Sequence, residues 1–563
     1  MTFPPSLHLL YFKIKSFLKM SSELTARTIV KNIASAIVFG SFSLGAYYFS
    51  RSTTYYLLDK AHLGVFLLHR FISMLLYVFF FSVNVGNIIV SYATLYRSQE
   101  TAYLLTKPVS HVGLFVIKFL DNFFYSSTTL FLMATAVLLG YGSYFDLSWG
   151  FYLQTMVLLF IPFMVLSASV GVIALMLLMN LASKIGIKTV LAFVGTGYIG
   201  LVYSYFRVTS PLDLVNNVMR YYPNVDQYYG FLEPSLVRYL PNQWVADALY
   251  WRIQGNSYHV FGYTFILLDA VFLTLVAMVI LAKKLYYSSW LTSLDLRARS
   301  EARGSSSGFL SFARRPMLEQ QKSVLLKKEF WQFFREPGQW IHLVIISLLV
   351  FVFLASVPQI RIGSKSPFLQ TVSYLVLYVF NAFLISSIAL RFVYPMMSIE
   401  GRSFWSVLSA PVSREKIYFT KFVIAILPIF VVSLFLGIVS YRPLQSYGLL
   451  LDLAIESAFF TTLALVSLNL GAGTFFSDFS ETNPIRIGSS QGATLTFLIS
   501  LVYLIFLIGV MFLPLFGYFE SMIRGTFFST RIMYSGMVIV SLGSLLVTFV
   551  SSAVGLRSLR RDF

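Results

Sequence analysis

The sequence contains no cysteine, and only 12% of its 563 residues are charged. The lack of cysteine excludes disulfide bonds and metal sites built from thiolates. The low share of charge excludes a soluble globular protein, since with 57% hydrophobic residues too little polar surface remains to cover the fold. The composition indicates an integral membrane protein that crosses the bilayer several times.

Sequence motifs for catalysis and nucleotide binding are also missing. The chain has six histidines, no His-Glu-x-x-His pattern and no Gly-x-x-x-x-Gly-Lys-Ser/Thr loop for phosphate. Gly195, Gly197 and Gly200 fit the G-x-G-x-x-G dinucleotide pattern, but they lie in an apolar run, where small residues let helices pack closely. We therefore predict that the chain is not an enzyme and that it binds no metal and no cofactor itself.

Acidic residues are few, since 23 Asp and Glu stand against 42 Lys and Arg, for a net charge of +19. In a membrane protein, such a charge is explained by the excess of basic residues in cytoplasmic loops and by their attraction to anionic lipid headgroups. The predicted partners therefore include membrane lipids and no nucleic acid. An N-terminus on the inside places most Lys and Arg in the cytoplasm, which predicts a multi-pass plasma or inner membrane protein with both termini cytoplasmic.

Apolar runs long enough to cross a hydrocarbon core of about 30 Å recur along the whole chain. They predict an all-α fold with about twelve transmembrane helices, six in each half. The predicted spans are 33–49, 71–95, 119–140, 149–178, 189–206, 260–282, 340–357, 372–393, 422–440, 449–470, 494–516 and 532–556.

Six spans return the chain to the side where it started, so the two halves enter the membrane in the same sense and form direct repeats. The predicted first half is 1–282, and it contains a tyrosine-rich external loop at 207–259. A basic cytoplasmic linker with an amphipathic helix at its end covers 283–339, and the second half is 340–563. Helical spacing in the external loop predicts short helices, which either cap the outer mouth or have only a structural role.

One phrase occurs in both halves. Residues 105–119 read LTKPVSHVGLFVIKF, and residues 408–422 read LSAPVSREKIYFTKF. In each copy proline ends a short amphipathic stretch, serine can cap the next helix, and a lysine lies near the cytoplasmic end of that helix. A plain turn explains one copy, whereas two copies at matched positions favour a shared function.

Polar side chains inside the predicted spans are costly and therefore informative. Asp269 and Glu456 are the ionisable residues that lie deepest, and Asn84 and Asn381 are further polar residues within spans. We predict that these four side chains line a substrate path. For Glu456, hydrogen bonding between helices is the alternative.

With these features, the sequence resembles the permease subunits of type-two ATP-binding cassette exporters, in which a cytoplasmic helix after the second span of each half docks on an ATPase subunit. Residues 400–403 (EGRS) and Trp405 strengthen the resemblance in the second half, whereas the first half has RSQE at 97–100. Residues 325–337 and 480–492 are similar to the family's amphipathic helix before a first span and its loop before a fifth. The resemblance implies ATPase coupling by Leu105, Pro108, Val109, Ser110, Lys118, Leu408, Pro411, Val412, Ser413 and Lys421.

The resemblance implies a fused permease served by two separate ATP-binding cassette ATPase subunits. ATP and Mg would then be bound by the partner subunits, and none by this chain. An apolar surface with few charges favours export of a lipid-like or amphipathic substrate. The alternative is a secondary, ion-coupled transporter with a six-plus-six helix plan, which would need buried protonatable residues such as Asp269 and Glu456.

Overall fold

A computed structural model describes residues 11–12, 15, 26–60, 62–185, 187–221, 224, 226–232, 234–294, 320–335, 339, 343, 346–347, 350, 367–441, 448–479, 484–488 and 490–560. Over these residues the chain is almost entirely helical and has no strand, which confirms the predicted all-α fold. The chain divides into two compact units, Met1–Ser307 and Gly308–Phe563, and each has its own hydrophobic core.

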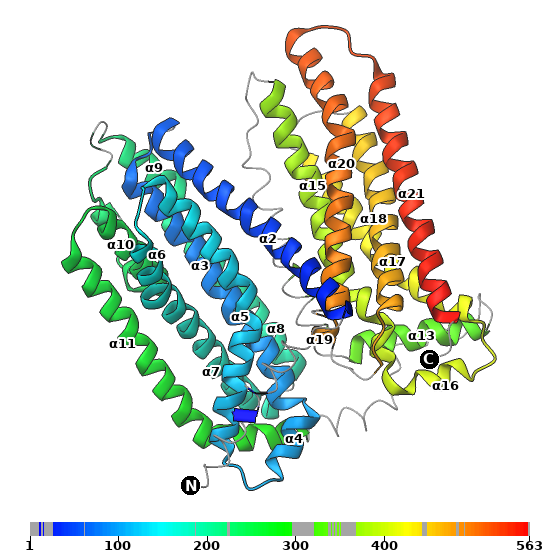
Figure 1. The fold of residues 1–563 in the computed structure, drawn as a ribbon, viewed down its shortest axis with the longest axis horizontal. Helices are drawn as coiled ribbons and strands as arrows, with labels where there is room; N and C mark the ends of the chain where they lie inside the picture. The colour runs from blue at the N-terminus through cyan, green and yellow to red at the C-terminus, as the bar shows by residue number, and fades with distance from the viewer. Residues whose placement is uncertain are drawn as a thin grey trace. The chain divides into compact units, whose positions relative to one another are not determined.

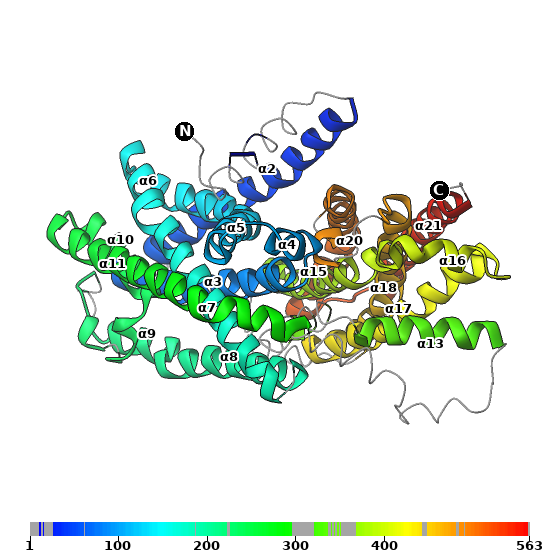
Figure 2. The same ribbon diagram turned by 90° about the horizontal axis from the view of Figure 1, so that it is seen from below.

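The first unit is a bundle of long helices joined by short segments (Figure 1). Within it, α3 packs against α5, α7 and α10, and Figure 2 shows α3, α5 and α7 side by side. The helices are α2 Ala26–Tyr55, η1 Tyr56–Lys60, α3 Gly64–Ser91, η2 Tyr92–Tyr96, α4 Gln99–Leu105, α5 His111–Tyr144, α6 Trp149–Thr155, η3 Met156–Phe160, α7 Ile161–Ile185, α8 Ile187–Thr209, α9 Pro211–Met219, η4 Gly230–Leu232, η5 Val237–Tyr239, α10 Pro241–Ile253, α11 Ser257–Leu281 and η6 Ala282–Tyr286.

The predicted external loop forms the short helices α9, η4, η5 and α10. In Figure 1, α9 lies at the end of the first unit opposite to α4. A buried ion pair joins this segment to the bundle, with Arg70 Nη2 of α3 2.8 Å from Asp247 Oδ1 of α10. Burial raises the pKa of Asp247 above its ordinary value, although Arg70 acts in the opposite direction. Ser73 donates a hydrogen bond of 2.7 Å to Gln243, so α10 is fixed to α3 by polar contacts as well as by packing.

The second unit contains a bundle of long helices with shorter ones at one end (Figure 1). Its helices are α13 Gln320–Arg335, α15 Pro367–Phe392, η9 Tyr394–Met396, η10 Ser398–Ser403, α16 Phe404–Leu408, α17 Arg414–Tyr441, α18 Leu449–Phe475, α19 Pro484–Gly488, α20 Gln491–Arg524 and α21 Thr530–Arg560. The most extensive packing between two helices of this unit is that of α18 on α21. A Cβ added to Gly471 would overlap the carbonyl oxygen of Ser551, so this crossing requires glycine.

Eight helices in the described part of the chain are long and apolar enough to cross a membrane, or nine if the pair His111–Thr128 and Leu130–Tyr144, bent by 47°, counts as one span. The eight are Gly64–Tyr96, Trp149–Leu181, Ser257–Leu294, Gln370–Gly401, Arg414–Val439, Leu449–Phe475, Gln491–Arg524 and Thr530–Arg560. They correspond to predicted spans and fit a membrane protein with several spans. The count of twelve and the two direct repeats stay predictions.

Three predicted spans are not among these candidates. Two of them, 33–49 and 189–206, lie in α2 and α8, and the third, 340–357, lies largely outside the described residues. Most of the predicted linker at 283–339 also lies outside them, and α13 forms near its end. The domain boundaries of the sequence analysis therefore stay predictions.

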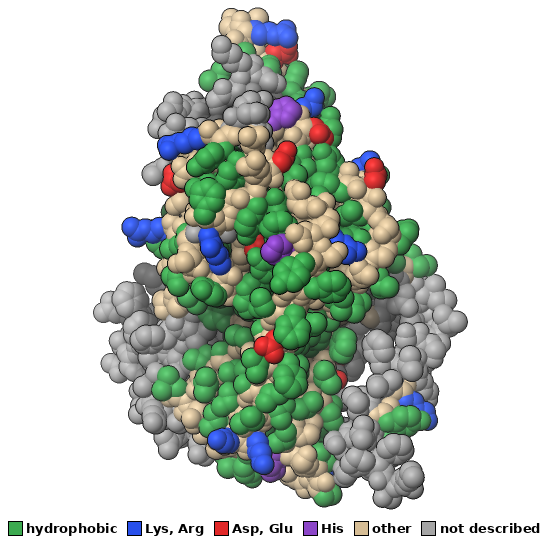
Figure 3. All heavy atoms as spheres, turned by 90° about the vertical axis from the view of Figure 1, so that its left-hand side faces the viewer, with side chains coloured by type: hydrophobic (Ala, Val, Ile, Leu, Met, Phe, Trp, Pro, Cys, Tyr) green, Lys and Arg blue, Asp and Glu red, His purple; other side chains and the backbone are tan. Residues whose placement is uncertain are grey.

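The surface of the first unit fits a lipid environment. Along α11, large hydrophobic side chains are exposed, among them Phe265 at 72% and Phe272 at 64%. Figure 3 faces the side of Figure 1 on which α11 lies, and it shows a broad area of hydrophobic side chains between regions that carry Lys and Arg. Such a band is typical of a protein surface in contact with lipid chains.

Candidate functional site: two turns with buried lysines

The two copies of the repeated phrase form the same local structure. In each, a short helix ends, α4 at Leu105 and α16 at Leu408, and a tight turn follows. The turn has the same hydrogen bond in both, with Val109 N donating to Lys107 O and Val412 N donating to Ala410 O, each at 2.7 Å.

A serine then caps the next helix in each copy. The Oγ of Ser110 accepts from Gly113 N at 3.1 Å, and the Oγ of Ser413 accepts from Lys416 N at 3.3 Å. These contacts satisfy backbone N–H groups that the first turn of a helix leaves unpaired. Pro108 and Pro411 are exposed beside the capping serines, which leaves each turn accessible from outside its unit.

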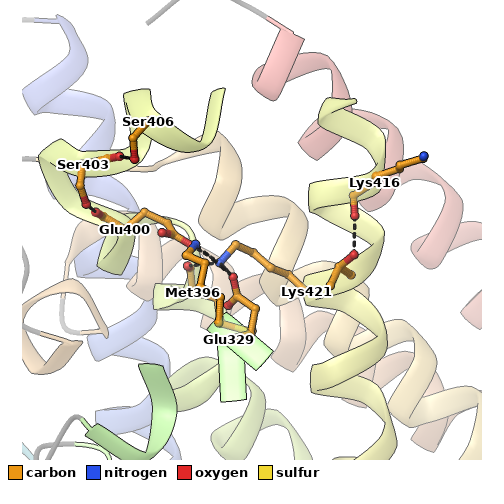
Figure 4. A network of polar contacts seen from close by, with 9 residues as sticks. Glu329, Met396, Glu400, Ser403, Ser406, Lys416 and Lys421 are labelled. Carbon is orange, nitrogen blue, oxygen red and sulfur yellow. Dashed lines mark hydrogen bonds and ion pairs between the residues drawn. The ribbon is translucent and has the colours of Figure 1, made fainter. Parts of the chain in front are cut away.

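In the second unit, Lys421 lies in the second turn of α17 with only 1% of its side chain exposed. Its Nζ is 2.7 Å from Glu329 Oε1 and 2.6 Å from Glu400 Oε1, and it donates to the carbonyl oxygen of Met396 at 3.1 Å (Figure 4). Lys328 Nζ is 2.5 Å from the same Glu400 oxygen. Two lysines and two glutamates give the cluster no net charge, which is the condition for burying charge at tolerable cost.

This cluster joins three separate elements, since Glu329 comes from α13, Glu400 from η10 and Lys421 from α17. Gly401 follows Glu400 with φ of 61° and ψ of −155°. Residues with a Cβ rarely adopt this backbone conformation, whereas glycine adopts it readily. The chain can therefore turn sharply after Glu400 towards Ser403 and α16. Ser403 and Ser406 continue the polar contacts away from Glu400 in Figure 4.

The equivalent lysine of the first unit has a simpler environment. Lys118 in α5 is 3% exposed, and its Nζ lies 2.7 Å from Glu100 Oε2 of α4. Glu100 is itself 47% exposed, so this pair is open to water on one side. The two sites share a buried lysine and a glutamate from the preceding short helical segment, but only the Lys421 site also holds a second glutamate from α13.

The predicted coupling residues do not include Glu329, Glu400, Lys328 or Glu100. A signal for one of them existed, because Glu329 is the single acidic residue in the basic helix α13. Arg70 and Asp247 were missed as well, since Asp247 belongs to a loop whose acidic residues follow no recognisable pattern.

The predicted substrate-path residues do not form one cluster. Asn84 of α3 is buried, donates from Nδ2 to Ser167 O at 2.9 Å, and contacts the hydroxyl of Tyr198 in α8. Asn381 of α15 borders a cavity of about 20 Å³ between α15, α17 and α18, enough for about one water molecule.

The two carboxylates lie in different environments. Glu456 of α18 is partly buried and accepts a hydrogen bond from Ser541 of α21, which agrees with a contact between helices. Asp269 is exposed halfway along the apolar helix α11. A carboxylate at the centre of a bilayer costs about 2.5–3.5 kcal/mol on insertion scales. A polar partner or a functional role is therefore expected for each of the two carboxylates.

No group of three or more His, Asp or Glu side chains that could hold a metal ion occurs where the structure describes the chain. The glycines at 195, 197 and 200 lie inside the continuous helix α8, not in a loop between a strand and a helix. The dinucleotide motif is thus not formed there.

Long apolar helices, an apolar outer surface and two matching turns, each followed by a buried lysine, are the features of an α-helical membrane protein. A family model described as "Putative ATP-binding cassette" matches residues 22–562, so the chain belongs to this ATP-binding cassette family. No curated protein matches the sequence.

The family match corrects three predictions. The chain was expected to be a pure permease whose energy comes from ATP hydrolysed by separate subunits, to have no enzymatic role, and to bind no nucleotide itself. A cassette family that spans nearly the whole chain points instead to an ATPase-type component that binds nucleotide. The prediction went too far because a missing phosphate loop excludes one mode of nucleotide binding and not the others.

Proposed function

We propose that this chain is the membrane-embedded component of an ATP-binding cassette transport system, and that its two buried-lysine turns carry nucleotide-dependent movement into the membrane helices. The Lys421 cluster is the observation that supports this most. It joins α13, η10 and α17, and α17 is the helix that follows the exposed turn at Pro411. The energy of a buried ion pair depends strongly on the distance between its two charges. A movement of that turn should therefore shift α13, η10 and α17 together.

Further ATP-binding cassette subunits are the proposed partners of the two turns. Beside the exposed prolines, Tyr103 is 61% exposed and Trp405 is 70% exposed. Exposed aromatic side chains next to a rigid turn are frequent anchors of protein interfaces. The proposed coupling residues are therefore the ten that the resemblance implies, with Glu329 and Glu400 added to the second site.

The organisation proposed for the whole chain is that of the type-two family, with two six-span halves fused in one chain as direct repeats and both termini in the cytoplasm of a plasma or inner membrane. Buried Asn84, Asn381 next to its small cavity, and partly buried Glu456 are proposed to line the substrate path. The exposure of Asp269 gives no support to that role for this residue.

The experiment uses the absence of native cysteine. Ser406→Cys, at an exposed position of α16 and labelled with an environment-sensitive fluorophore, reports on this helix in the full chain in nanodiscs. ATP is added to the chain alone and to the chain with any cassette subunits that co-purify. We expect ATP to change the fluorescence, and Lys421→Met to abolish at least about four fifths of that change.

Lys416→Met is the matched control, because Lys416 lies on the same helix and points away from the cluster in Figure 4. It should leave the response within about a fifth of the original. A fluorescence that ignores ATP in both preparations would refute a nucleotide-dependent role for this segment. An equal loss in both lysine variants would show that Lys421 has no special part in transmission.

A further inference from the structure

The outward face of α11 carries one carboxylate among apolar side chains. Asp269 is exposed, and it is surrounded at helical spacing by Phe265, Ile266, Phe272, Leu273 and Val276, which are all exposed as well. Residues three and four positions apart share a face of a helix, so these side chains form a single surface. No described residue makes a hydrogen bond or ion pair with Asp269.

Asp269 lies at the midpoint of α11, which runs from Ser257 to Leu281 within the membrane-crossing candidate Ser257–Leu294. At 1.5 Å per residue, it is about 18 Å from either end of α11. Lys and Arg can extend their charge to the membrane surface from such a depth, but the short side chain of Asp cannot. In lipid alone, this face would hold a carboxyl group in hydrocarbon without a partner, and such residues normally pair with another polar group.

We propose that this face of α11 binds a membrane-spanning helix of a partner protein, and that the partner presents a Lys or Arg side chain to Asp269. A cation is the complementary group for a carboxylate in a medium of low dielectric constant. The aromatic and aliphatic side chains above and below Asp269 provide the packing surface that holds two helices together in lipid.

Charge argues against a second copy of the chain as the occupant. Two copies that meet through the same face of α11 would place two Asp269 carboxylates near each other, because a twofold contact pairs a surface with itself. Like charges at such a distance repel strongly in lipid. This partner site is separate from the turns proposed for cassette subunits, since α11 contains none of their residues.

The test measures energy transfer between the full chain and a synthetic helix in lipid vesicles. The chain carries a donor on Tyr258→Cys, an 83% exposed position in the first turn of α11. The probe is a Leu- and Ala-rich peptide of about 24 residues, long enough to span the bilayer, with an acceptor at the matching end and one central Lys. A second peptide has Leu in place of that Lys.

We expect the Lys peptide to bind the chain at least about fivefold more tightly than the Leu peptide, and Asp269→Leu to remove this difference. Asp213→Asn, which changes an exposed acid on α9, should leave it intact. Because Asp269 is exposed and makes no hydrogen bond or ion pair with a described residue, its substitution should preserve folding, which size-exclusion elution checks.

Two results would overturn the proposal. Equal binding of the two peptides to the unmodified chain would show that Asp269 does not select a cation, or that another part of this chain already covers it. Energy transfer between donor-labelled and acceptor-labelled chains, lost in Asp269→Leu, would assign the face to a second copy.

Discussion

Lys421 and Glu400 lie 2.6 Å apart, both buried, although they come from different elements of the second unit. Glu329 completes the arrangement from α13, 92 residues away from Lys421 in the chain. This contact fixes three segments around one ammonium group, and it gives the first prediction.

Removal of Lys421 should destabilise the second unit strongly. Lys421→Met leaves Glu329 and Glu400 buried near each other with Lys328 as the remaining cation, and breaking a buried pair costs about 3–5 kcal/mol. Lys118→Met should cost only about 0–1 kcal/mol, because its partner Glu100 is half exposed and water can solvate it. Thermal unfolding of both variants in the same detergent compares them, and equal shifts in the midpoint would contradict the prediction.

The ion pair between Arg70 and Asp247 should behave as a coupled unit. Arg70→Met leaves a buried carboxylate and should cost about 3–5 kcal/mol. The double variant Arg70→Met/Asp247→Asn should recover more than about 1 kcal/mol of this loss, since no buried charge remains. Limited proteolysis within the segment from α9 to α10 measures the effect, and simple additivity of the two single variants would show that the pair is not coupled.

The same pair predicts a pH dependence. Burial raises the pKa of Asp247, and loss of Arg70 should raise it further. A carboxyl whose pKa is higher in the folded state than in the unfolded state loses stability as pH rises, starting from its unfolded pKa of about 3.9. Arg70→Met should therefore be least stable at neutral pH and gain stability on acidification. Arg70→Met/Asp247→Asn should lack this gain, and parallel pH profiles of the two variants would disprove the assignment.

Close packing of α18 on α21 should make Gly471 intolerant of any side chain. Gly471→Ala places a Cβ against the carbonyl oxygen of Ser551, and overpacking of this kind costs about 1–3 kcal/mol. Gly509→Ala in α20 is the control, because a Cβ there meets nothing within 4 Å. The control should be neutral or slightly stabilising, since alanine favours helices. Thermal unfolding separates the two, and a neutral Gly471→Ala would mean that the helices are less tightly packed.

The capping serines should be equivalent. Ser110→Ala and Ser413→Ala each remove one hydrogen bond to a first-turn N–H, at 3.1 and 3.3 Å respectively, and caps contribute about 0.5–2 kcal/mol. Hydrogen exchange at Gly113 and Lys416 should accelerate in the respective variant and nowhere else in α5 or α17. Faster exchange along a whole helix would indicate that the serine does more than cap.

Local patterns in the sequence predicted much of the fold. Long apolar runs located the candidate spans, and helical spacing in the external loop predicted short helices there, of which α10 is one, because both signals depend on neighbouring residues alone. The repeated phrase likewise predicted a proline turn followed by a serine cap in both units.

Pairing between distant segments could not be predicted in this way. Arg70 and Asp247 are 177 residues apart, and nothing in the spacing of either one identifies the other. The partners of Lys421 were missed for the same reason, although the lysine itself was found. The nucleotide prediction failed differently, because it treated the lack of one motif as the lack of a function.

The burial of the ion pairs around Lys421 determines how they respond to salt. Dissolved ions weaken attraction between charges that water can reach, such as Arg560 and Glu415, which lie 2.9 Å apart with side chains 64% and 42% exposed. They cannot enter the space between Lys421 and its two glutamates, which is closed to solvent. The connection between α13, η10 and α17 should thus keep its strength across the range of salt concentrations that a cell meets.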